Sequence, residues 1–356
     1  MLCHSIYGPD IWYHLSWGRS LAFSGAFTPQ LNVLLQQPIV ANIYWLFQLV
    51  TYGVFSLGGA IGIGILFMLF WIFIAACWLA MTGAWKNQNF GPLLFLAFVL
   101  CAQLRFEHRP EVFSYLFLVL LLLLLRFRDL GRPLEPMFLL LIFFVQAVWS
   151  NSHGYFALGP LLGLALVTST LWTAGSVERV QVLRASIIAA VLLAGSFVSP
   201  FTYHNWELVF GLMDVSRGLR AVNHELMSPE IFPLYWPMQL FWSLWLMTTV
   251  WSLRELYLRR STFSALLALA GAVLALQAIR NSPLYLLLSA PALSWVLVEL
   301  DRLVARTNKW VTGAIYWMPG LVALGFALSV YTDEYYFSSR SLATFGMHVE
   351  RASYPI

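Results

Sequence analysis

The run AIGIGILFMLFWIFIAACWLAMTG at residues 60–83 decides the fold. It is continuously apolar, and it is long enough for an α-helix to cross a hydrocarbon core of about 30 Å, which takes roughly 20 residues. Apolar and polar residues do not alternate along it, so the run does not have the pattern of a barrel strand. Residues 60–83 therefore predict a membrane-spanning α-helix.

The composition also indicates a lipid-embedded chain. Of its 356 residues, 60% are hydrophobic and 10% are charged, which leaves too little polar surface to cover a soluble globule. The formal net charge of +4 does not indicate nucleic acid as a partner, because the arginines stand singly between apolar runs. Cys3, Cys77 and Cys101 are too few and too scattered for a disulfide framework.

Nine further apolar runs follow, so we expect an all-α, polytopic transmembrane helix bundle with about ten spanning helices. The expected spans are 60–83, 90–106, 110–127, 136–150, 154–174, 183–201, 234–253, 262–279, 283–298 and 310–331. Short connections make consecutive helices antiparallel neighbours. We expect an external interfacial segment at 1–58, the bundle at 59–331 and an external C-terminal segment at 332–356, with truncation of the chain at its ends left open.

The stretch Ile39–Leu57 determines which side of the membrane the N-terminal segment occupies. Basic loops follow residues 127, 174, 253 and 298, on alternate connections, and therefore define the cytoplasmic face. If Ile39–Leu57 crossed the membrane, Asp10 would be cytoplasmic, away from the other polar clusters. The stretch mixes aromatic and polar residues, as an in-plane helix does. We therefore expect interfacial helices in a first external loop.

Five polar clusters are then expected at the outer face, where a membrane protein that gathers charged side chains is expected to bind a charged ligand. They are GPDIWYHLSWG at residues 8–18, RFEHR at 105–109, SNSHG at 150–154, SPFTYHNW at 199–206 and RNSP at 280–283.

Each cluster also has a purely structural reading. Asp10 could be an N-cap, although His14 lies four residues later on the same helix face, where the two could act together or share a cation. Arg105 and Arg109 in one tight turn suit a phosphate, whereas an ion pair with Glu107 is the structural alternative. Taken alone, His153 is more simply explained as a histidine at the membrane interface whose hydrogen bonds are satisfied.

The motifs resemble those of the GT-C class of bacterial polyprenyl-phosphate-sugar glycosyltransferases and their uncharacterised multi-spanning relatives. GPDIWYHLSWG is similar to the Asp-x-Trp-x-His-Leu-x-x-Gly opening of their first external loop. HRPEVFSY at 108–115 is similar to Arg-Pro-Gln-hydrophobic-Ser-Tyr, WSNSHGYF at 149–156 to Trp-Ala-Asn-x-His-Gly, and SPFTYHNW to Asn-Pro-x-Gly. The resemblance covers most of the chain.

The resemblance implies a membrane glycosyltransferase that moves a sugar from a polyprenyl-phosphate donor to an acceptor glycan, lipid or protein. It implies the bacterial cytoplasmic (inner) membrane, with the site facing outward. Asp10 would be the general base, assisted by His14, or a ligand for a divalent cation; no cofactor is otherwise indicated. Substrate or phosphate contacts are expected from Trp12, Arg105, His108, Arg109, Asn151, His153, His204 and Arg280.

Two other classes remain open. A transporter would use the outer clusters as a vestibule, but it should carry charged residues at mid-span and broken helices near the bilayer centre. Mid-span charges are missing from the expected spans. A non-catalytic scaffold with a GT-C-like bundle is the third reading.

Overall fold

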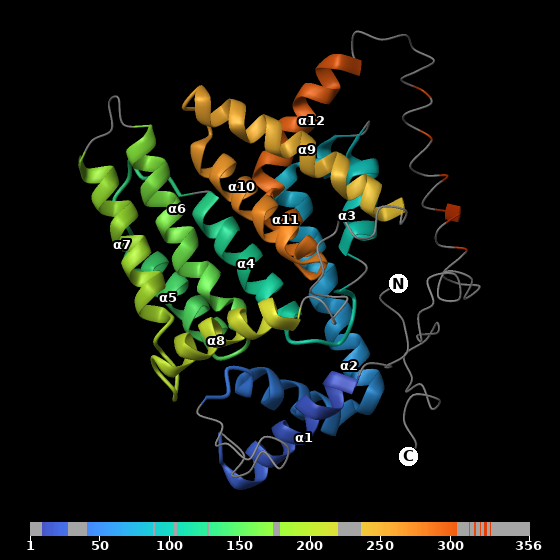
Figure 1. The fold of residues 1–356 in the computed structure, drawn as a ribbon, viewed down its shortest axis with the longest axis vertical. Helices are drawn as coiled ribbons and strands as arrows, with labels where there is room; N and C mark the ends of the chain where they lie inside the picture. The colour runs from blue at the N-terminus through green and yellow to red at the C-terminus, as the bar shows by residue number, and fades with distance from the viewer. Residues whose placement is uncertain are drawn as a thin grey trace.

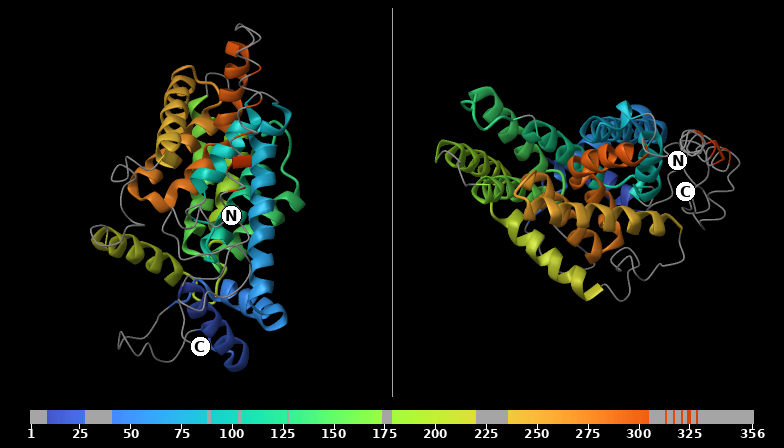
Figure 2. Two further views of the ribbon diagram at one scale, coloured as in Figure 1. Left: turned by 90° about the vertical axis from the view of Figure 1, so that its right-hand side faces the viewer. Right: turned by 90° about the horizontal axis from the view of Figure 1, so that it is seen from above.

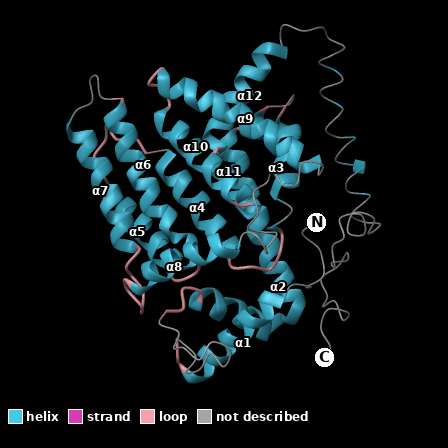
Figure 3. Cartoon of the chain, viewed as in Figure 1, coloured by secondary structure: helices cyan, strands magenta, loops and turns pink. Residues whose placement is uncertain are grey.

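The structure, a computed structural model, describes residues 9–27, 41–87, 90–102, 105–126, 128–173, 179–219 and 236–304, with six single positions between 313 and 328. Helices are its only regular structure in these residues (Figure 3). The predicted all-α class is therefore confirmed for the part of the chain that the structure describes. The C-terminal segment 332–356 and most of the expected span 310–331 lie outside the described residues.

Twelve α-helices and three short 3-10 turns make up the described fold. They are α1 (Pro9–Ser24), α2 (Trp45–Thr82), η1 (Ala84–Lys86), α3 (Gly91–Ala102), α4 (Glu111–Arg126), α5 (Pro136–Ser150), η3 (Gly154–Ala157), α6 (Leu158–Trp172), α7 (Arg179–Gly195), α8 (His204–Leu219), α9 (Trp236–Tyr257), α10 (Thr262–Gln277), η6 (Ile279–Asn281), α11 (Ser282–Leu288) and α12 (Ala290–Val304). Most of them stand side by side, whereas α1 and α8 lie across the lower end of the bundle in Figure 1.

The number of membrane spans is smaller than expected. Among the described helices, Trp45–Thr82 and Gly154–Trp172 are long and apolar enough to cross a membrane, and a third span arises if the bent pair Ile279–Leu288 and Ala290–Arg302 is counted as one. The other apolar helices, such as Gly91–Ala102 and Pro136–Ser150, are shorter than the roughly 20 residues that a span needs. The bundle of about ten spans is therefore not confirmed.

Apolar side chains nevertheless cover the outside of the bundle. Ile61, Ile65, Leu69 and Ile72 are exposed at helical spacing along α2. The helices α5, α6 and α7 expose similar rows, which include Met137, Leu140, Phe144, Leu161, Leu164, Leu183 and Leu193. Exposed apolar surface of this extent is typical of contact with a membrane or another protein. The described helices are thus consistent with an integral membrane protein.

A break at Gly59 divides α2 into two parts. Its backbone angles, φ 58° and ψ −147°, are not helical and belong to a region that essentially only glycine adopts. The break falls between the expected interfacial stretch Ile39–Leu57 and the expected span 60–83. The part before Gly59 lies with α1 at the lower end of the bundle (Figure 1).

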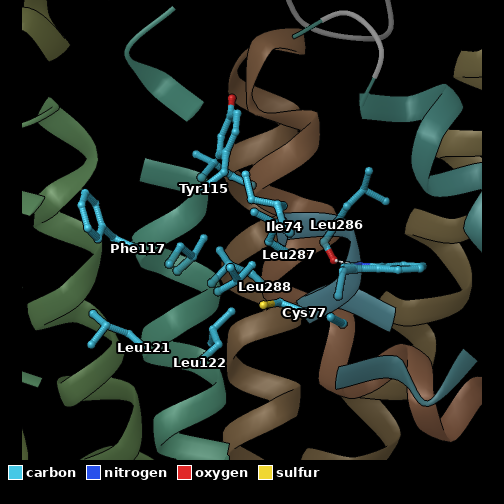
Figure 4. Packing of buried hydrophobic residues seen from close by; sticks show 14 of the residues in the cluster. Ile74, Cys77, Tyr115, Phe117, Leu121, Leu122, Leu286, Leu287 and Leu288 are labelled. Atoms are coloured by element: carbon cyan, nitrogen blue, oxygen red, sulfur yellow. Dashed lines mark hydrogen bonds between the residues drawn. The ribbon is translucent and has the colours of Figure 1, made fainter. Parts of the chain in front are cut away.

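The core forms where α2, α4 and α11 meet (Figure 4). Every residue of α11 is buried, which places this short helix in the interior of the bundle. The indole N–H of Trp78 on α2 donates to the Leu286 carbonyl over 2.9 Å. The expected span 283–298 is thus two helices, α11 and α12, with axes bent by 68°. Figure 2 shows both from two further directions.

Candidate functional site

The described members of the polar clusters come from α1, α8 and the turns between helices at one end of the bundle. Asn151, at the end of α5, ties these turns together. Its Oδ1 accepts from the Trp45 indole over 2.7 Å, and its Nδ2 donates to the carbonyls of Ala147 and Val198. Both the oxygen and the nitrogen of this side-chain amide form hydrogen bonds within the protein, so Asn151 holds α2 against the α7–α8 turn. It has little capacity left for a substrate.

The carboxylate of Asp10 stands at the start of α1 and is about half exposed. The guanidinium Nε of Arg109 lies 3.2 Å from its Oδ2, and the same nitrogen pairs with Glu107. The α3–α4 turn thus reaches α1 through one arginine that bridges two carboxylates. Arg109 is therefore an orienting partner of Asp10, and the ion pair with Glu107 that the sequence left as the structural alternative is present.

Deeper in the same turn, Arg105 pairs with Glu111, the first residue of α4. Arg105 is 4% exposed and the Glu111 side chain 13%. Removal of two charges from water is costly unless they compensate each other, which accounts for their close contact. Both arginines of the RFEHR cluster therefore have carboxylate partners.

Two of the buried histidines, His14 and His153, have hydrogen-bond partners on neighbouring helices. Nδ1 of His14 lies 3.3 Å from the amide nitrogen of Gln48 on α2, whereas Asp10 contacts Arg109. Nδ1 of His153 lies 2.9 Å from the hydroxyl of Ser114 on α4. Among the described residues no hydrogen bond joins Asp10 to His14. The four-residue spacing therefore does not bring these two side chains into direct contact.

Both imidazoles are neutral near pH 7. Burial lowers the pKa of His14 to about 4, which Glu111 opposes and Arg109 reinforces. Burial also lowers the pKa of His153 to about 4. The charge of Glu111 opposes this shift, whereas Arg280 and Arg105 reinforce it. Uncharged imidazoles offer hydrogen bonds to a ligand without repelling the nearby guanidiniums.

Arg280 forms no ion pair within the part of the chain that the structure describes. It lies on η6, next to Asn281, whose Oδ1 accepts from the Tyr155 hydroxyl over 3.0 Å. Its Nε is buried, and within the described residues it has no hydrogen-bond partner. Its charge nevertheless acts on His153 and Tyr44. A guanidinium whose Nε has no partner among the described residues, and whose charge acts on the neutral His153, is suited to binding an anion.

Three other expected contact residues pack against or bind neighbouring side chains. Trp12 packs its ring edge against Phe55, with 6.0 Å between centroids. His108 is 7% exposed and packs on Phe67. Nδ1 of His204 lies 2.7 Å from the carboxylate of Glu207 at the start of α8, in an exposed hydrogen bond. These contacts indicate that all three stabilise the scaffold.

A divalent cation has no obvious site. Among the described residues no group of three or more His, Cys, Asp and Glu side chains is placed to hold a metal ion. The positive charge of Arg109 already faces the carboxylate of Asp10. The residues therefore do not fit the cation alternative, and we derive no step through a metal.

Sequence reasoning missed several residues of this end. Gln48 lies in the mixed aromatic and polar stretch Ile39–Leu57 and Ser114 in the motif HRPEVFSY, and both are fully or nearly fully buried. The sequence signal is a polar residue flanked by apolar ones in each helix, since a polar group that is buried there needs a partner. Glu111 reads as an ordinary first-turn acid, which conceals its pairing with Arg105.

Comparison of the chain with protein-family models, with curated proteins and with solved structures gives no match. The resemblance to GT-C glycosyltransferases therefore stays a prediction from the motifs.

Proposed function

We propose that this chain is an integral membrane glycosyltransferase of the GT-C type, which moves a sugar from a polyprenyl-phosphate donor to an acceptor at the outer face of a bacterial inner membrane. One observation carries the proposal: a half-exposed carboxylate, Asp10, oriented by Arg109, shares the polar end of the bundle with Arg280, whose buried Nε has no partner among the described residues. A base for the acceptor and a cation for the leaving phosphate are the two groups that such a transfer needs.

The proposed reaction assigns each group a role. The carboxylate of Asp10 takes the proton of the acceptor hydroxyl as the acceptor oxygen bonds to the anomeric carbon of the sugar. The bond from that carbon to the phosphate oxygen breaks, and the polyprenyl phosphate leaves with the electron pair. Arg280 stabilises the charge that develops on this phosphate. Arg109 keeps the carboxylate directed at the acceptor.

The exposed apolar rows of α2 and α5 support a donor whose tail stays in the lipid. A lipid-linked phosphate places its charge at the interface and its chain in the hydrocarbon layer. A site at the end of an apolar bundle is accessible to both parts of such a molecule.

Transport is the second candidate function, because one observation favours it. The helices α11 and α12 are bent by 68°, and a broken span near a charged residue is typical of secondary transporters. In that reading Arg280, just before α11, would bind an anionic solute.

The substitution Asp10→Asn tests the transferase. The amide keeps the shape of the carboxylate but cannot take the proton, so donor turnover should fall at least about 100-fold. The assay measures release of polyprenyl phosphate from a polyprenyl-phosphate sugar in sealed proteoliposomes, with acceptor extracts added outside. Asp129→Asn, at an exposed carboxylate paired with Arg132 in the α4–α5 loop, is the matched control.

Full turnover in Asp10→Asn would leave Asp10 as a helix cap. Ion-driven accumulation of a solute inside the vesicles, unchanged by Asp10→Asn, would replace the transferase with transport.

A further inference from the structure

Two imidazoles flank the ring of Tyr44. Its centroid lies 5.4 Å from that of His14 and 5.6 Å from that of His153. The two histidines are 6% and 7% exposed, and each forms its hydrogen bonds through Nδ1 alone within the described residues. The position of the single ring proton on each histidine follows from the partners of that nitrogen.

For His153, a backbone amide determines which ring nitrogen carries the proton. The N–H of Tyr155 can only donate, and it donates to Nδ1 over 3.2 Å. The indole N–H of Trp149 donates to the Ser114 oxygen over 2.8 Å, which leaves the Ser114 hydrogen directed at the same Nδ1. A nitrogen that accepts these bonds carries no proton, so the neutral ring carries its proton on Nε2.

For His14, the same reasoning runs through two side-chain amides. The backbone N–H of Tyr44 donates to Oδ1 of Asn42 over 3.2 Å, which identifies the other end of Asn42 as its NH₂ group. That group donates to Oε1 of Gln48 over 2.8 Å, so the NH₂ group of Gln48 faces His14. Nδ1 of His14 therefore accepts, and Nε2 again carries the proton.

We infer that Gln48 and Ser114 are positioning residues, which hold His14 and His153 as Nε2–H tautomers so that both imidazoles donate hydrogen bonds to phosphate oxygens. The inference deepens the proposed transferase and rests on it for the identity of the phosphate. It assigns neither histidine a proton-transfer role, in contrast to the assistance to Asp10 expected from the sequence.

Histidine ¹⁵N NMR of the full chain in nanodiscs tests the tautomers without any ligand. We expect Nε2–H at both His14 and His153 at pH 7.5, with signals assigned by single His→Gln variants. His204 is an internal comparison of the opposite kind, because its Nδ1 lies 2.7 Å from the Glu207 carboxylate, which can only accept. Nδ1–H at His14 or His153 in the unmodified protein would overturn the inference.

The positioning role of Gln48 has its own variant. Gln48→Glu replaces the NH₂ group with an acceptor, so the signal of His14 should change to a ring protonated on Nδ1, while that of His153 stays. Gln146→Glu is the matched control, since Gln146 is equally buried on α5 and donates to the Phe156 carbonyl. An unchanged His14 in folded Gln48→Glu would remove the role of Gln48. A misfolded variant leaves the measurement on the unmodified protein to decide.

Binding of a polyprenyl monophosphate tests the donor role. The amide nitrogen of glutamine can replace Nε2–H, so His153→Gln should bind within about threefold of the unmodified protein and His153→Phe at least about fivefold more weakly. The same pair at His14 should behave alike. Equal weakening by Gln and Phe would overturn the donor role. If the monophosphate does not bind to the unmodified protein but inorganic phosphate does, the lipid donor of the proposed function fails while the tautomers and the phosphate contact stand.

Discussion

The packing of α1 on α2 leaves no room for a side chain at residue 18. A Cβ atom on Gly18 would lie 2.1 Å from the backbone oxygen of Gln48 and 2.7 Å from Cβ of Tyr52. Neither atom is the end of a flexible side chain, so neither can rotate away. In Gly18→Ala, α1 must therefore retreat by about 1.3 Å, from 2.1 Å to the 3.4 Å at which ordinary contact begins.

The energetic cost of that retreat is of the size seen for overpacked cores, about 1–3 kcal/mol. It falls first on the contact between α1 and α2, from which Ile11 and Leu15 join the core. The displacement also moves Asp10 relative to Arg109. A misplacement of about 1 Å at a reacting group lowers turnover by roughly 100-fold, which is the activity loss we expect.

Gly53→Ala is the matched control. Gly53 lies in the same part of α2, and a Cβ atom there meets nothing within 4 Å. Alanine is favoured over glycine inside a helix by roughly 0.5–1 kcal/mol, so this variant should be unchanged or slightly more stable.

Hydrogen exchange of the α1 amides in nanodiscs measures the docking directly, and thermal unfolding reports on the bundle. Gly18→Ala should exchange faster along residues 9–24 while the bundle unfolds near its usual temperature. If Gly18→Ala and Gly53→Ala exchange alike, the close approach of the two helices is refuted.

Three further outcomes are expected. Arg280→Lys keeps the charge but loses the planar fork, so binding of polyprenyl phosphate in nanodiscs should weaken about tenfold; equal affinity for Arg, Lys and Ala would remove Arg280 from the site. As the pH falls from 6.5 towards 4, the free energy of unfolding should decrease by up to about 3 kcal/mol for each of His14 and His153, because burial lowers their pKa and the unfolded chain binds protons first; urea titrations across this pH range measure it. An impermeant thiol reagent outside intact cells should label Ser24→Cys and not Ser261→Cys at the opposite end; protection of Ser24→Cys would contradict an outward-facing site.

The helical class could be predicted from the sequence because it depends on a property that every long apolar run shows. The expected range 136–150 coincides with α5, and 262–279 nearly coincides with α10. The number of spans could not be predicted as well. An apolar run indicates burial, either in lipid or inside the protein. The helix α11 is apolar because other helices surround it.

The site was predictable in composition and less so in its pairings. The sequence identified Asp10 and Arg109 separately, and the structure brings them to 3.2 Å. It could not show that Arg105 is neutralised by Glu111, because that pairing depends on the exact turn between α3 and α4. Spacing along one helix likewise suggested a partner for His14 that the packing against Gln48 replaces.

The break at Gly59 lets one continuous stretch of chain serve two environments. A straight helix of 38 residues would be about 57 Å long, nearly twice the hydrocarbon thickness of about 30 Å. Divided at Gly59, the later part measures about 35 Å, close to the thickness of the hydrocarbon core, and the earlier part can turn aside and pack on α1. The glycine thus sets where Gln48 and the histidine that it contacts lie relative to the apolar part of α2. Any side chain at residue 59 would be strained in this conformation and would favour a straight rod, which carries Gln48 away from α1.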